Sequence, residues 1–248
     1  LLHTATLVHD DVVDESMERR GFFSINAVWK NKIAVLVGDY LLSKGLLLST
    51  SNNDFEHLHI LSEAVKQMSE GELLQMEKAR RLDIDEEVYF EIIKSKTASL
   101  LSSACAVGAY STSGDKAKAD VMKKFGEKVG IAFQIKDDLF DYGTQDVGKP
   151  TGNDIREKKL TLPLIYTLKK SDRETRRELI YIVKNENENK AKIQRVIDTV
   201  IKAGGISYAE TMMKKYRDEA LEILFTYPES EERNALEELV RYTTDRSY

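Results

Sequence analysis

The spacing of apolar residues constrains the fold of this chain more than any other feature. Apolar side chains recur every three or four residues through long windows such as "FEHLHILSEAVKQMSEGELLQMEKAR" and "VYFEIIKSKTASLLSSACAVGAY". This period is typical of helices that bury one face. Only three prolines occur in 248 residues, so few positions interrupt the pattern. The sequence therefore predicts an all-α protein.

Turn signals divide this pattern into separate helices. Gly, Pro, Asn and Asp gather at breaks such as "STSGD" and "GTQDVGKPTGND", where these residues cap or end helices. The predicted helices cover residues 1–16, 31–51, 55–80, 86–111, 115–142, 155–170, 173–185, 190–203, 206–225 and 230–243. No linker separates two halves, so we expect one domain over residues 1–248. Because the sequence starts inside an apolar periodic segment without Met, we expect this domain to lack its N-terminal helices.

The amino-acid composition limits which molecules this chain is expected to bind and in which compartment it is expected to lie. The net charge of −5 argues against an electrostatic hold on nucleic acid. The single cysteine, Cys105, excludes a disulfide framework and suits a reducing compartment. No apolar run approaches the roughly 18 to 20 residues that span a bilayer. These features predict a soluble, cytoplasmic protein, and we expect its one tryptophan, Trp29, to be a packing residue.

Two aspartate triplets with the same spacing suggest a paired site. The first is Asp10, Asp11 and Asp14 in "LVHDDVVDES", and the second is Asp137, Asp138 and Asp141 in "FQIKDDLFDYG". Carboxylates four residues apart share one helix face and repel unless a cation lies between them. Hard oxygen ligands suit Mg²⁺, which is completed by water and phosphate oxygens. Two solvated acidic faces are the alternative, but apolar neighbours such as Val8 and Ile135 argue for buried helices.

Basic residues accompany both triplets. Arg offers a planar fork for phosphate, and Lys offers a mobile point charge. The candidates are Arg19 and Arg20 in "ESMERRGFF", Lys96 in "IIKSKTASLL", Lys149 in "DVGKPTG", and Lys158 and Lys159 in "REKKLTLP". Each residue taken singly fits an ordinary surface charge better than a ligand, so their placement beside the triplets carries the argument. "GTQDVGK" also fits part of a nucleotide-binding loop, but Pro150 stands where Ser or Thr would hold Mg²⁺.

Four segments together resemble one known family. "HTATLVHDDVVDESMERRG", "SKTASL", "FQIKDDLFD" and "GKPTGNDIREKKLTLPL" are similar to the motifs of the trans-isoprenyl (polyprenyl) diphosphate synthases. The similarity is greatest to bacterial medium- and long-chain all-trans members, and its motifs end at about residue 170. The resemblance implies an isoprenoid-synthase-type helical bundle around a central cavity. It also implies a homodimer, with the two acidic motifs facing each other across the cavity mouth.

The resemblance also implies roles for individual residues. It makes Asp10, Asp14 and Asp137 direct ligands of Mg²⁺, about three ions per active site, with Asp11, Asp138 and Asp141 supporting them. Arg19, Lys96 and Lys149 would bind the allylic diphosphate, whereas Arg20 and His3 would face isopentenyl diphosphate. Lys159 would be a further substrate-binding residue. Thr97 and Gln134 would turn oxygens toward a carbocation. The family's upstream Gly-Lys-x-x-Arg-Pro segment is absent from this sequence.

The implied activity is condensation of isopentenyl diphosphate with an allylic diphosphate to an all-trans polyprenyl diphosphate. Ala5 and Thr6 precede the first triplet, where short-chain members carry bulky aromatics, so we expect about thirty to forty carbons. Such a product would supply quinone side chains through membrane enzymes. Ordinary core packing is the alternative for this pair. A short-chain synthase and a noncatalytic partner subunit remain alternatives for the chain, whereas a class I terpene cyclase has a different second metal motif.

Overall fold

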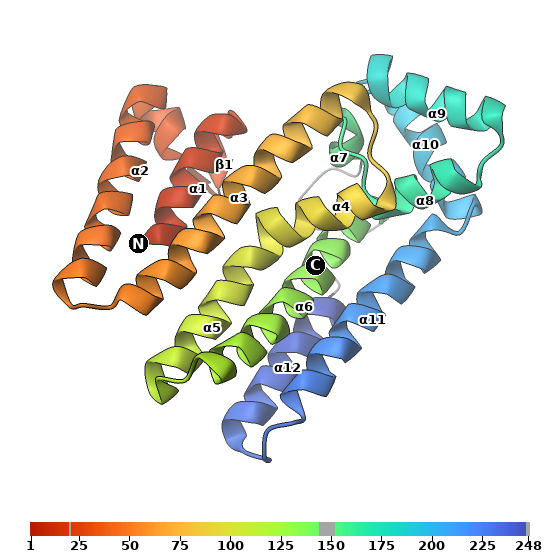
Figure 1. Ribbon diagram of the computed structural model, residues 1–248. Helices are drawn as coiled ribbons and strands as arrows, with labels where there is room; N and C mark the ends of the chain where they lie inside the picture. Colours follow the sequence, from red (N-terminus) through yellow and green to blue (C-terminus); the bar gives the residue numbers. More distant parts are fainter. Residues whose placement is uncertain (20, 144–151, 247–248) are drawn as a thin grey trace. The chain divides into compact units, whose positions relative to one another are not determined.

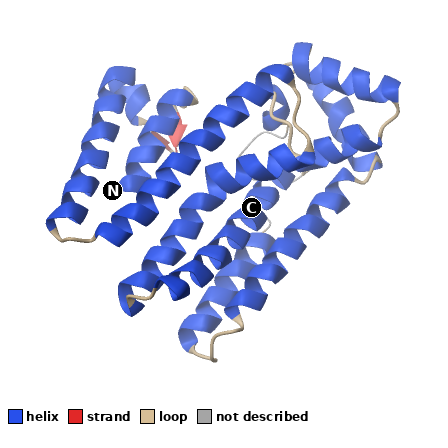
Figure 2. Cartoon of the chain, viewed as in Figure 1, coloured by secondary structure: helices blue, strands red, loops and turns tan. Residues whose placement is uncertain are grey.

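The computed structural model is almost entirely helical (Figures 1 and 2). It describes residues 1–19, 21–143 and 152–246, without the side chain of Arg81. The helices are α1 (Leu2–Val13), α2 (Ile25–Ser51), α3 (Phe55–Arg81), α4 (Glu86–Ile93), the π-helix η1 (Lys94–Ala98), α5 (Ser99–Ser113), α6 (Lys116–Phe140), α7 (Asn153–Arg156), α8 (Leu162–Lys170), α9 (Arg173–Asn185), α10 (Lys190–Lys202), α11 (Gly205–Leu224) and α12 (Glu231–Asp245). The all-α prediction is confirmed.

Contacts within the chain define two compact units, Leu1–Lys66 and Gln67–Tyr248. Each unit is described by itself below. The first contains the first aspartate triplet, and the second contains the other triplet with the Lys-Thr segment. The expectation of one domain over residues 1–248 stays a prediction.

In the first unit α1 packs against α2. The close approach depends on Gly38, because a Cβ atom built there would lie 2.2 Å from His9 Nε2. His9 Nε2 lies 3.3 Å from Asp39 Oδ1 and 3.3 Å from the Val35 carbonyl oxygen. The glycine therefore makes room for a histidine that ties the two helices together.

A short hairpin replaces the predicted end of the first helix. Helix α1 ends at Val13, not at residue 16, and the following segment forms strands β1 (Glu18–Arg19) and β2 (Phe22–Phe23). The strands pair antiparallel. Gly21 has φ of +79°, a conformation that glycine adopts without a Cβ penalty. Gly21 therefore lies in the hairpin segment.

Helix α2 begins six residues before the predicted start at residue 31. Ser24 caps it, because its hydroxyl accepts a hydrogen bond from the Ala27 amide at 3.0 Å. Lys30 departs from helical geometry, with φ of 68° and ψ of 164°. This kink separates a short first segment from the long apolar one, which is why the apolar pattern alone located only the second.

Among the described residues, α2 is long and apolar enough to cross a membrane. This corrects the expectation that no segment reaches that length. Asp39 and Lys44 interrupt the apolar run, but an 18-residue window still has a mean hydropathy of 1.4. Only 17% of that window is buried. Length and composition alone are weak evidence for a membrane span, because some core helices and signal sequences share them.

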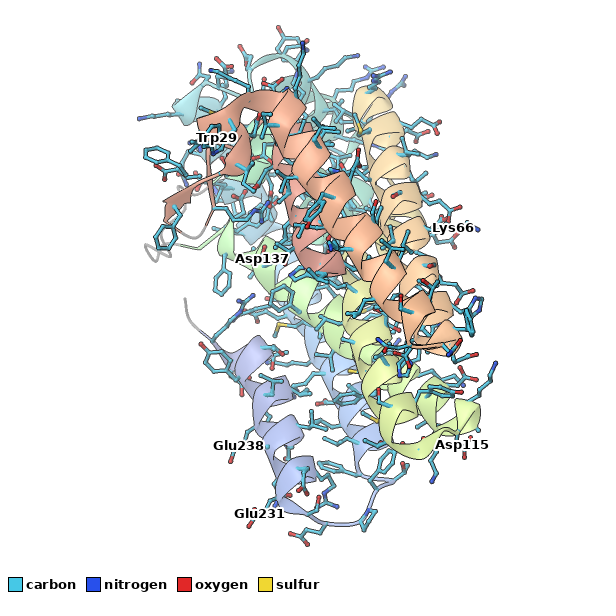
Figure 3. All side chains as sticks on the ribbon, turned by 90° about the vertical axis from the view of Figure 1, so that its left-hand side faces the viewer. Trp29, Lys66, Asp115, Asp137, Glu231 and Glu238 are labelled. Atoms are coloured by element: carbon cyan, nitrogen blue, oxygen red, sulfur yellow. The ribbon has the colours of Figure 1, made fainter. Side chains whose placement is uncertain are left out.

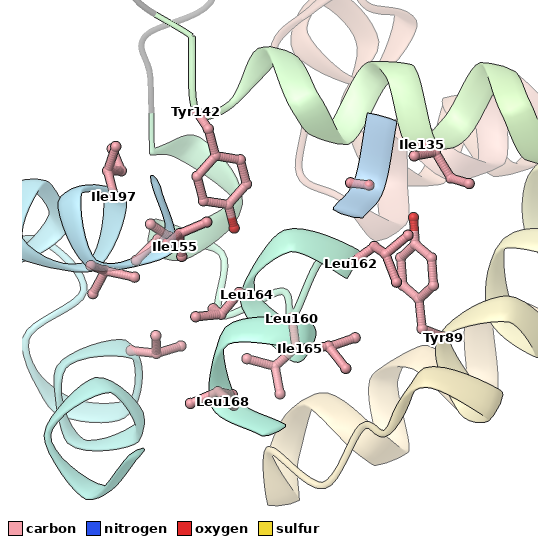
Figure 4. Packing of buried hydrophobic residues seen from close by; sticks show 14 of the residues in the cluster. Tyr89, Ile135, Tyr142, Ile155, Leu160, Leu162, Leu164, Ile165, Leu168 and Ile197 are labelled. Carbon is pink, nitrogen blue, oxygen red and sulfur yellow. The ribbon is translucent and has the colours of Figure 1, made fainter. Parts of the chain in front are cut away.

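The second unit is built around α6, which contacts α4, η1, α5, α8, α11 and α12 (Figure 1). Its apolar residues enter a core shared with α4, α8 and α10 (Figure 4). The fully buried members of this core include Ile135, Ile155, Leu162, Leu164, Leu179, Ile182, Val196 and Val200. Helix α6 thereby holds the second triplet, at its carboxyl end, on a rigid support.

Two predicted helices of this unit are divided in the structure. The expected helix over 86–111 is interrupted by the π-helical turn η1, which contains the Lys-Thr pair. The expected helix over 155–170 splits into α7 and α8, because residues 157–161 leave the helix and Pro163 lies in the first turn of α8. Helices α9 and α10 match their predicted bounds within one residue.

Candidate active site

The buried member of the first triplet is Asp11. Its side chain is 7% exposed, and Arg19 Nε and Nη2 both lie 2.7 Å from its Oδ1 atom. Asn26 Nδ2 donates to the Asp11 backbone carbonyl at 3.5 Å. Asp11 therefore holds the Arg19 guanidinium from β1 beside the end of α1. A charge-assisted pair of this kind fixes the orientation of the arginine as well as its position.

The outer members of this triplet are more accessible. Asp10 is half-buried, and Asp14 is exposed at the C-cap of α1. The carbonyl end of a helix carries a partial negative charge, so carboxylates there attract a cation more strongly than the same groups in mid-helix. His3, two turns earlier, is exposed. Arg20 lies outside the described residues.

In the second triplet, as in the first, the middle aspartate is buried and binds other polar side chains. Asp138 is 6% exposed and accepts two hydrogen bonds, from Tyr89 Oη at 2.7 Å and from Gln134 Nε2 at 2.8 Å. Burial raises the pKa of Asp138 to about 7, although both hydrogen bonds act in the opposite direction. In both triplets the second aspartate is therefore buried and fixes another polar side chain.

The Lys-Thr segment meets α6 at this network. Thr97 Oγ1 donates to Gln134 Oε1 at 2.8 Å. Lys96 Nζ lies 2.5 Å from Glu72 Oε2. A Cβ atom at Gly71 would lie 2.8 Å from the Lys96 amide nitrogen, so this glycine lets α3 approach η1 closely. Single π-helical turns occur frequently at functional sites, and this one brings together residues that the motifs predicted separately.

Asp141 has a different environment from the other carboxylates. Its side chain accepts from the Asn153 amide at 2.7 Å, and its carbonyl accepts from the Gly152 amide at 3.0 Å. Its Oδ2 atom is buried without a hydrogen-bond partner among the described residues. Burial raises the pKa of this carboxyl. Asp141 therefore joins the end of α6 to the start of α7, while Lys149 between them lies outside the described residues.

A fourth carboxylate, Asp154, belongs to the same cluster and was missed by sequence reasoning. Burial raises its pKa to about 8, and the charges of Asp138 and Asp141 add to the shift. Lys159 acts in the opposite direction on Asp138 and Asp154 and forms an ion pair with Glu157. The motif "GKPTGNDIREKK" contained the signal, but its aspartate was not singled out.

Asp137 is the accessible carboxylate of the second triplet (Figure 3). Its side chain is 41% exposed, and Arg246 Nη2 lies 3.5 Å from its Oδ1 atom. The Arg246 guanidinium lies 4.5 Å from the ring centre of Phe133 and 5.2 Å from that of Phe140. A cation from the last helix therefore already faces this carboxylate. Sequence reasoning missed Arg246 because the recognisable motifs end near residue 170.

The carboxylates fit magnesium only as a partial ligand set. Within the described residues, no three His, Cys, Asp or Glu side chains converge to hold a metal ion. Asp11, Asp138 and Asp141 are committed to protein hydrogen bonds. Asp10, Asp14 and Asp137 present hard oxygens at helix ends. Mg²⁺ commonly takes one or two carboxylates and completes its shell with water and phosphate oxygens, so each triplet by itself offers part of such a shell.

The amino-acid sequence matches the family described as polyprenyl synthetase over residues 1–200. The chain belongs to this family. The all-trans-nonaprenyl-diphosphate synthase (geranyl-diphosphate specific) of Rhodobacter capsulatus is 37% identical over 249 residues, which cover 99% of this chain and 75% of that protein. All the motif residues discussed above lie inside the matched range, whereas Arg246 lies beyond it.

Solved structures of this family have the same fold. A decaprenyl diphosphate synthase from Rhodobacter capsulatus superposes with a TM-score of 0.93 at 35% identity and covers 100% of this chain and 77% of its own. A polyprenyl synthase from Caulobacter crescentus, complexed with calcium and isoprenyl diphosphate, gives 0.89 at 36% identity, with 100% and 76% covered. The predicted isoprenoid-synthase-type helical fold is therefore confirmed.

The buried carboxyls of Asp138 and Asp154 should make the stability of the folded chain depend on pH. With folded pKa values of about 7 for Asp138 and about 8 for Asp154 against an ordinary value of 3.8, the native state holds protons that the unfolded chain releases. In the metal-free protein their contribution to stability is therefore complete below about pH 4 and is lost as the pH rises to about 8. We expect a lower melting temperature at about pH 8 than at about pH 5.5 in the presence of a chelator.

The Asp138→Asn variant isolates this effect, because asparagine does not titrate. Its melting temperature should fall less between the two pH values than that of the unmodified protein. An equal fall in both proteins would show that other groups cause the pH dependence.

Proposed function

We propose that this chain condenses isopentenyl diphosphate with an allylic diphosphate and extends it to an all-trans polyprenyl diphosphate in a Mg²⁺-dependent reaction. The observation that carries the proposal is that the two aspartate triplets have the same arrangement. Each ends a helix, and in each the middle aspartate is buried and fixes a polar side chain of the predicted site. The solved Caulobacter crescentus relative is complexed with calcium and isoprenyl diphosphate, which supports a divalent metal and a diphosphate as ligands of this chain.

Departure of diphosphate from the allylic carbon leaves a carbocation and new negative charge on the leaving group. Asp10, Asp14 and Asp137 would hold Mg²⁺, and the bound metal would supply positive charge at that leaving group. Lys96 and Arg19 would add fixed cations where the charge develops. Lys96 exchanges its Glu72 partner for a phosphate oxygen in this scheme, because the two groups are paired in the structure.

The carbocation requires oxygen dipoles and an alkene nucleophile. Gln134 Oε1 accepts one hydrogen bond, from Thr97, which leaves its second lone pair for the cation. The π electrons of isopentenyl diphosphate form the new carbon–carbon bond, and its second carbon then loses a proton to the released diphosphate. We further propose that His3 and Arg20 bind isopentenyl diphosphate. Lys149 and Lys159 would add to the hold on the allylic diphosphate.

Product analysis tests this function. The purified chain is incubated with Mg²⁺, labelled isopentenyl diphosphate and an allylic primer, and the dephosphorylated products are separated by chromatography. We expect all-trans products of about thirty to forty carbons, and the names of the nonaprenyl and decaprenyl relatives support a long product over a short one. Products of fifteen or twenty carbons would identify a short-chain synthase. No elongation by any primer would favour a noncatalytic partner subunit.

We also propose that the chain forms a homodimer through α2. Exposed apolar side chains follow one another along this helix after the kink at Lys30, at mostly helical spacing: Ile33, Leu36, Tyr40 and Leu47. Trp29, before the kink, is 63% exposed, so the packing role expected for it is not found within this chain (Figure 3). A continuous exposed apolar stripe marks an interaction surface in a protein of this size. A second copy of the chain would cover it with the same stripe, as two-fold symmetry requires.

Charge placed in this stripe should dissociate the dimer. We expect Leu36→Glu with Leu47→Glu to convert a dimer into a monomer in sedimentation experiments, because buried unpaired carboxylates are costly. Leu239→Glu on α12 is the matched control, since Leu239 is 56% exposed on another helix. A dimer that survives the double substitution would place the interface elsewhere, and binding of the unmodified chain to lipid vesicles would favour a membrane role for α2. Cytoplasmic location and delivery of the product to membrane enzymes complete the proposal.

A further inference from the structure

A chain of three hydrogen bonds links a buried tyrosine to the Lys-Thr segment. Tyr89 Oη donates to Asp138 Oδ2 at 2.7 Å, and Gln134 Nε2 donates to Asp138 Oδ1 at 2.8 Å. Thr97 Oγ1 then donates to Gln134 Oε1 at 2.8 Å. The chain therefore joins residues from α4, α6 and η1, and Asp138 is its central acceptor.

Asp138 determines which way the Gln134 amide faces. In its ionised form Asp138 accepts hydrogen bonds and cannot donate them, so Gln134 must then turn its NH₂ group toward Asp138. Its carbonyl oxygen must then point to the opposite side, where Thr97 donates to it. Without a fixed acceptor the amide could rotate by half a turn, which would exchange a carbonyl oxygen for an NH₂ group on that side.

Tyr89 in turn fixes Asp138. The tyrosine is 4% exposed in the apolar core, and its ring lies among side chains of α6 and α8, with its hydroxyl directed toward α6 (Figure 4). Buried hydroxyls require a hydrogen-bond partner. Since Asp138 accepts from both Tyr89 and Gln134, the tyrosine holds one carboxylate oxygen and leaves the other for the amide.

We propose that Tyr89 is a positioning residue of the condensation reaction, which acts through Asp138 to keep the carbonyl oxygen of Gln134 on the side of Thr97. This inference rests on the proposed function. Tyr89 touches neither substrate nor metal in this scheme. Its effect is on carbocation formation, because an oxygen dipole stabilises that cation and an amide NH₂ group in its place destabilises it. Other residues bind the diphosphates.

Tyr89→Phe removes one oxygen atom and tests the link directly. With Mg²⁺ and both diphosphates present, we expect kcat to fall by about ten- to a hundredfold, while KM for each diphosphate changes by less than about twofold. A purely structural tyrosine would lower the amount of folded enzyme and leave the kcat of the folded fraction unchanged. Unchanged kcat in folded Tyr89→Phe would overturn the inference.

Tyr208→Phe is the matched control. Tyr208 on α11 also donates to a carboxylate, that of Glu86 on α4, so both tyrosines tie α4 to another helix through the same kind of bond. Glu86 lies outside both triplets. We expect Tyr208→Phe to keep its kcat, with a change of melting temperature similar to that of Tyr89→Phe. An equal loss of kcat in both variants would show that loosening α4 is sufficient, and it would overturn the specific role of Tyr89.

A double-mutant cycle with Gln134→Ala gives a second, independent reading. If Tyr89 acts through Gln134, adding Tyr89→Phe to Gln134→Ala should cause no further loss of kcat. Multiplied losses would mean that the tyrosine acts by another route. Should Tyr89→Phe fail to fold, Asp138→Asn tests the same link, because a single amide oxygen replaces the two acceptors. It should reproduce the loss of kcat and the non-additivity with Gln134→Ala, and normal kcat would contradict the inference.

The outcome for the unmodified chain separates this inference from the proposed function. Elongation by the unmodified chain with normal turnover in Tyr89→Phe rejects only the positioning role. Absence of elongation by the unmodified chain with every primer rejects the proposed function itself.

Discussion

Replacing Asp137 by asparagine is expected to lower kcat/KM by about a hundred- to a thousandfold while leaving the helical fold unchanged. The side chain is 41% exposed and does not belong to the hydrophobic core, so little packing is lost. The substitution removes a charged oxygen at the point where the proposed magnesium ion would bind, and a metal holds a neutral amide more weakly than a carboxylate. Steady-state kinetics at saturating Mg²⁺ measures the loss, and circular dichroism confirms the fold.

Asp120→Asn provides the comparison on the same helix. Asp120 is exposed on α6, more than four turns before the triplet, so its charge is solvated and distant from the site. Its kcat/KM should stay within about twofold of the unmodified protein. An Asp137→Asn enzyme that keeps more than half of its activity would remove Asp137 from the ligand set. Recovery at higher Mg²⁺ concentration would support weakened metal binding as the cause.

The sequence contained most of the helical architecture because its signals are local. Apolar periodicity and caps such as Asp172 and Asn189 locate α9 and α10, where both asparagine and aspartate side chains accept first-turn amide hydrogen bonds. Such signals act within a few residues, so they need no tertiary information. The kink at Lys30 and the hairpin around Gly21 have no comparable periodic signal, and both were missed.

The motifs predicted which residues belong to the site, but they did not predict the separate role of each residue. Spacing treats Asp137 and Asp138 alike, yet one is accessible and the other is buried against Tyr89, 49 residues away in the sequence. In the same way, Asp11 is distinguished from Asp10 by Arg19, which lies on a hairpin that was not predicted. Which carboxylate positions a neighbour and which remains available to a cation depends on tertiary partners that a single motif does not contain.

Gly130→Ala is expected to destabilise the second unit by about 1–3 kcal/mol, because overpacked contacts between two helices cannot relax freely. A Cβ atom at Gly130 would lie 2.5 Å from the Ala98 Cα atom and 2.7 Å from its Cβ atom. Ala98 is the last residue of η1, and Gly130 lies one turn before Gln134. The substitution should therefore push η1 away from α6 and lengthen the Thr97–Gln134 hydrogen bond, so that kcat falls together with the melting temperature.

Gly108→Ala on α5 distinguishes this clash from a general effect of replacing a helical glycine. No atom lies within 4 Å of a Cβ atom built at Gly108. Alanine there should raise stability by up to about 1 kcal/mol, because it restricts the unfolded chain and favours the helix. Thermal unfolding of both variants, with kcat measured on the same samples, gives opposite signs if close packing of η1 on α6 is the cause. If Gly130→Ala is stabilised and keeps a normal kcat, then η1 can move away from α6 without affecting the site.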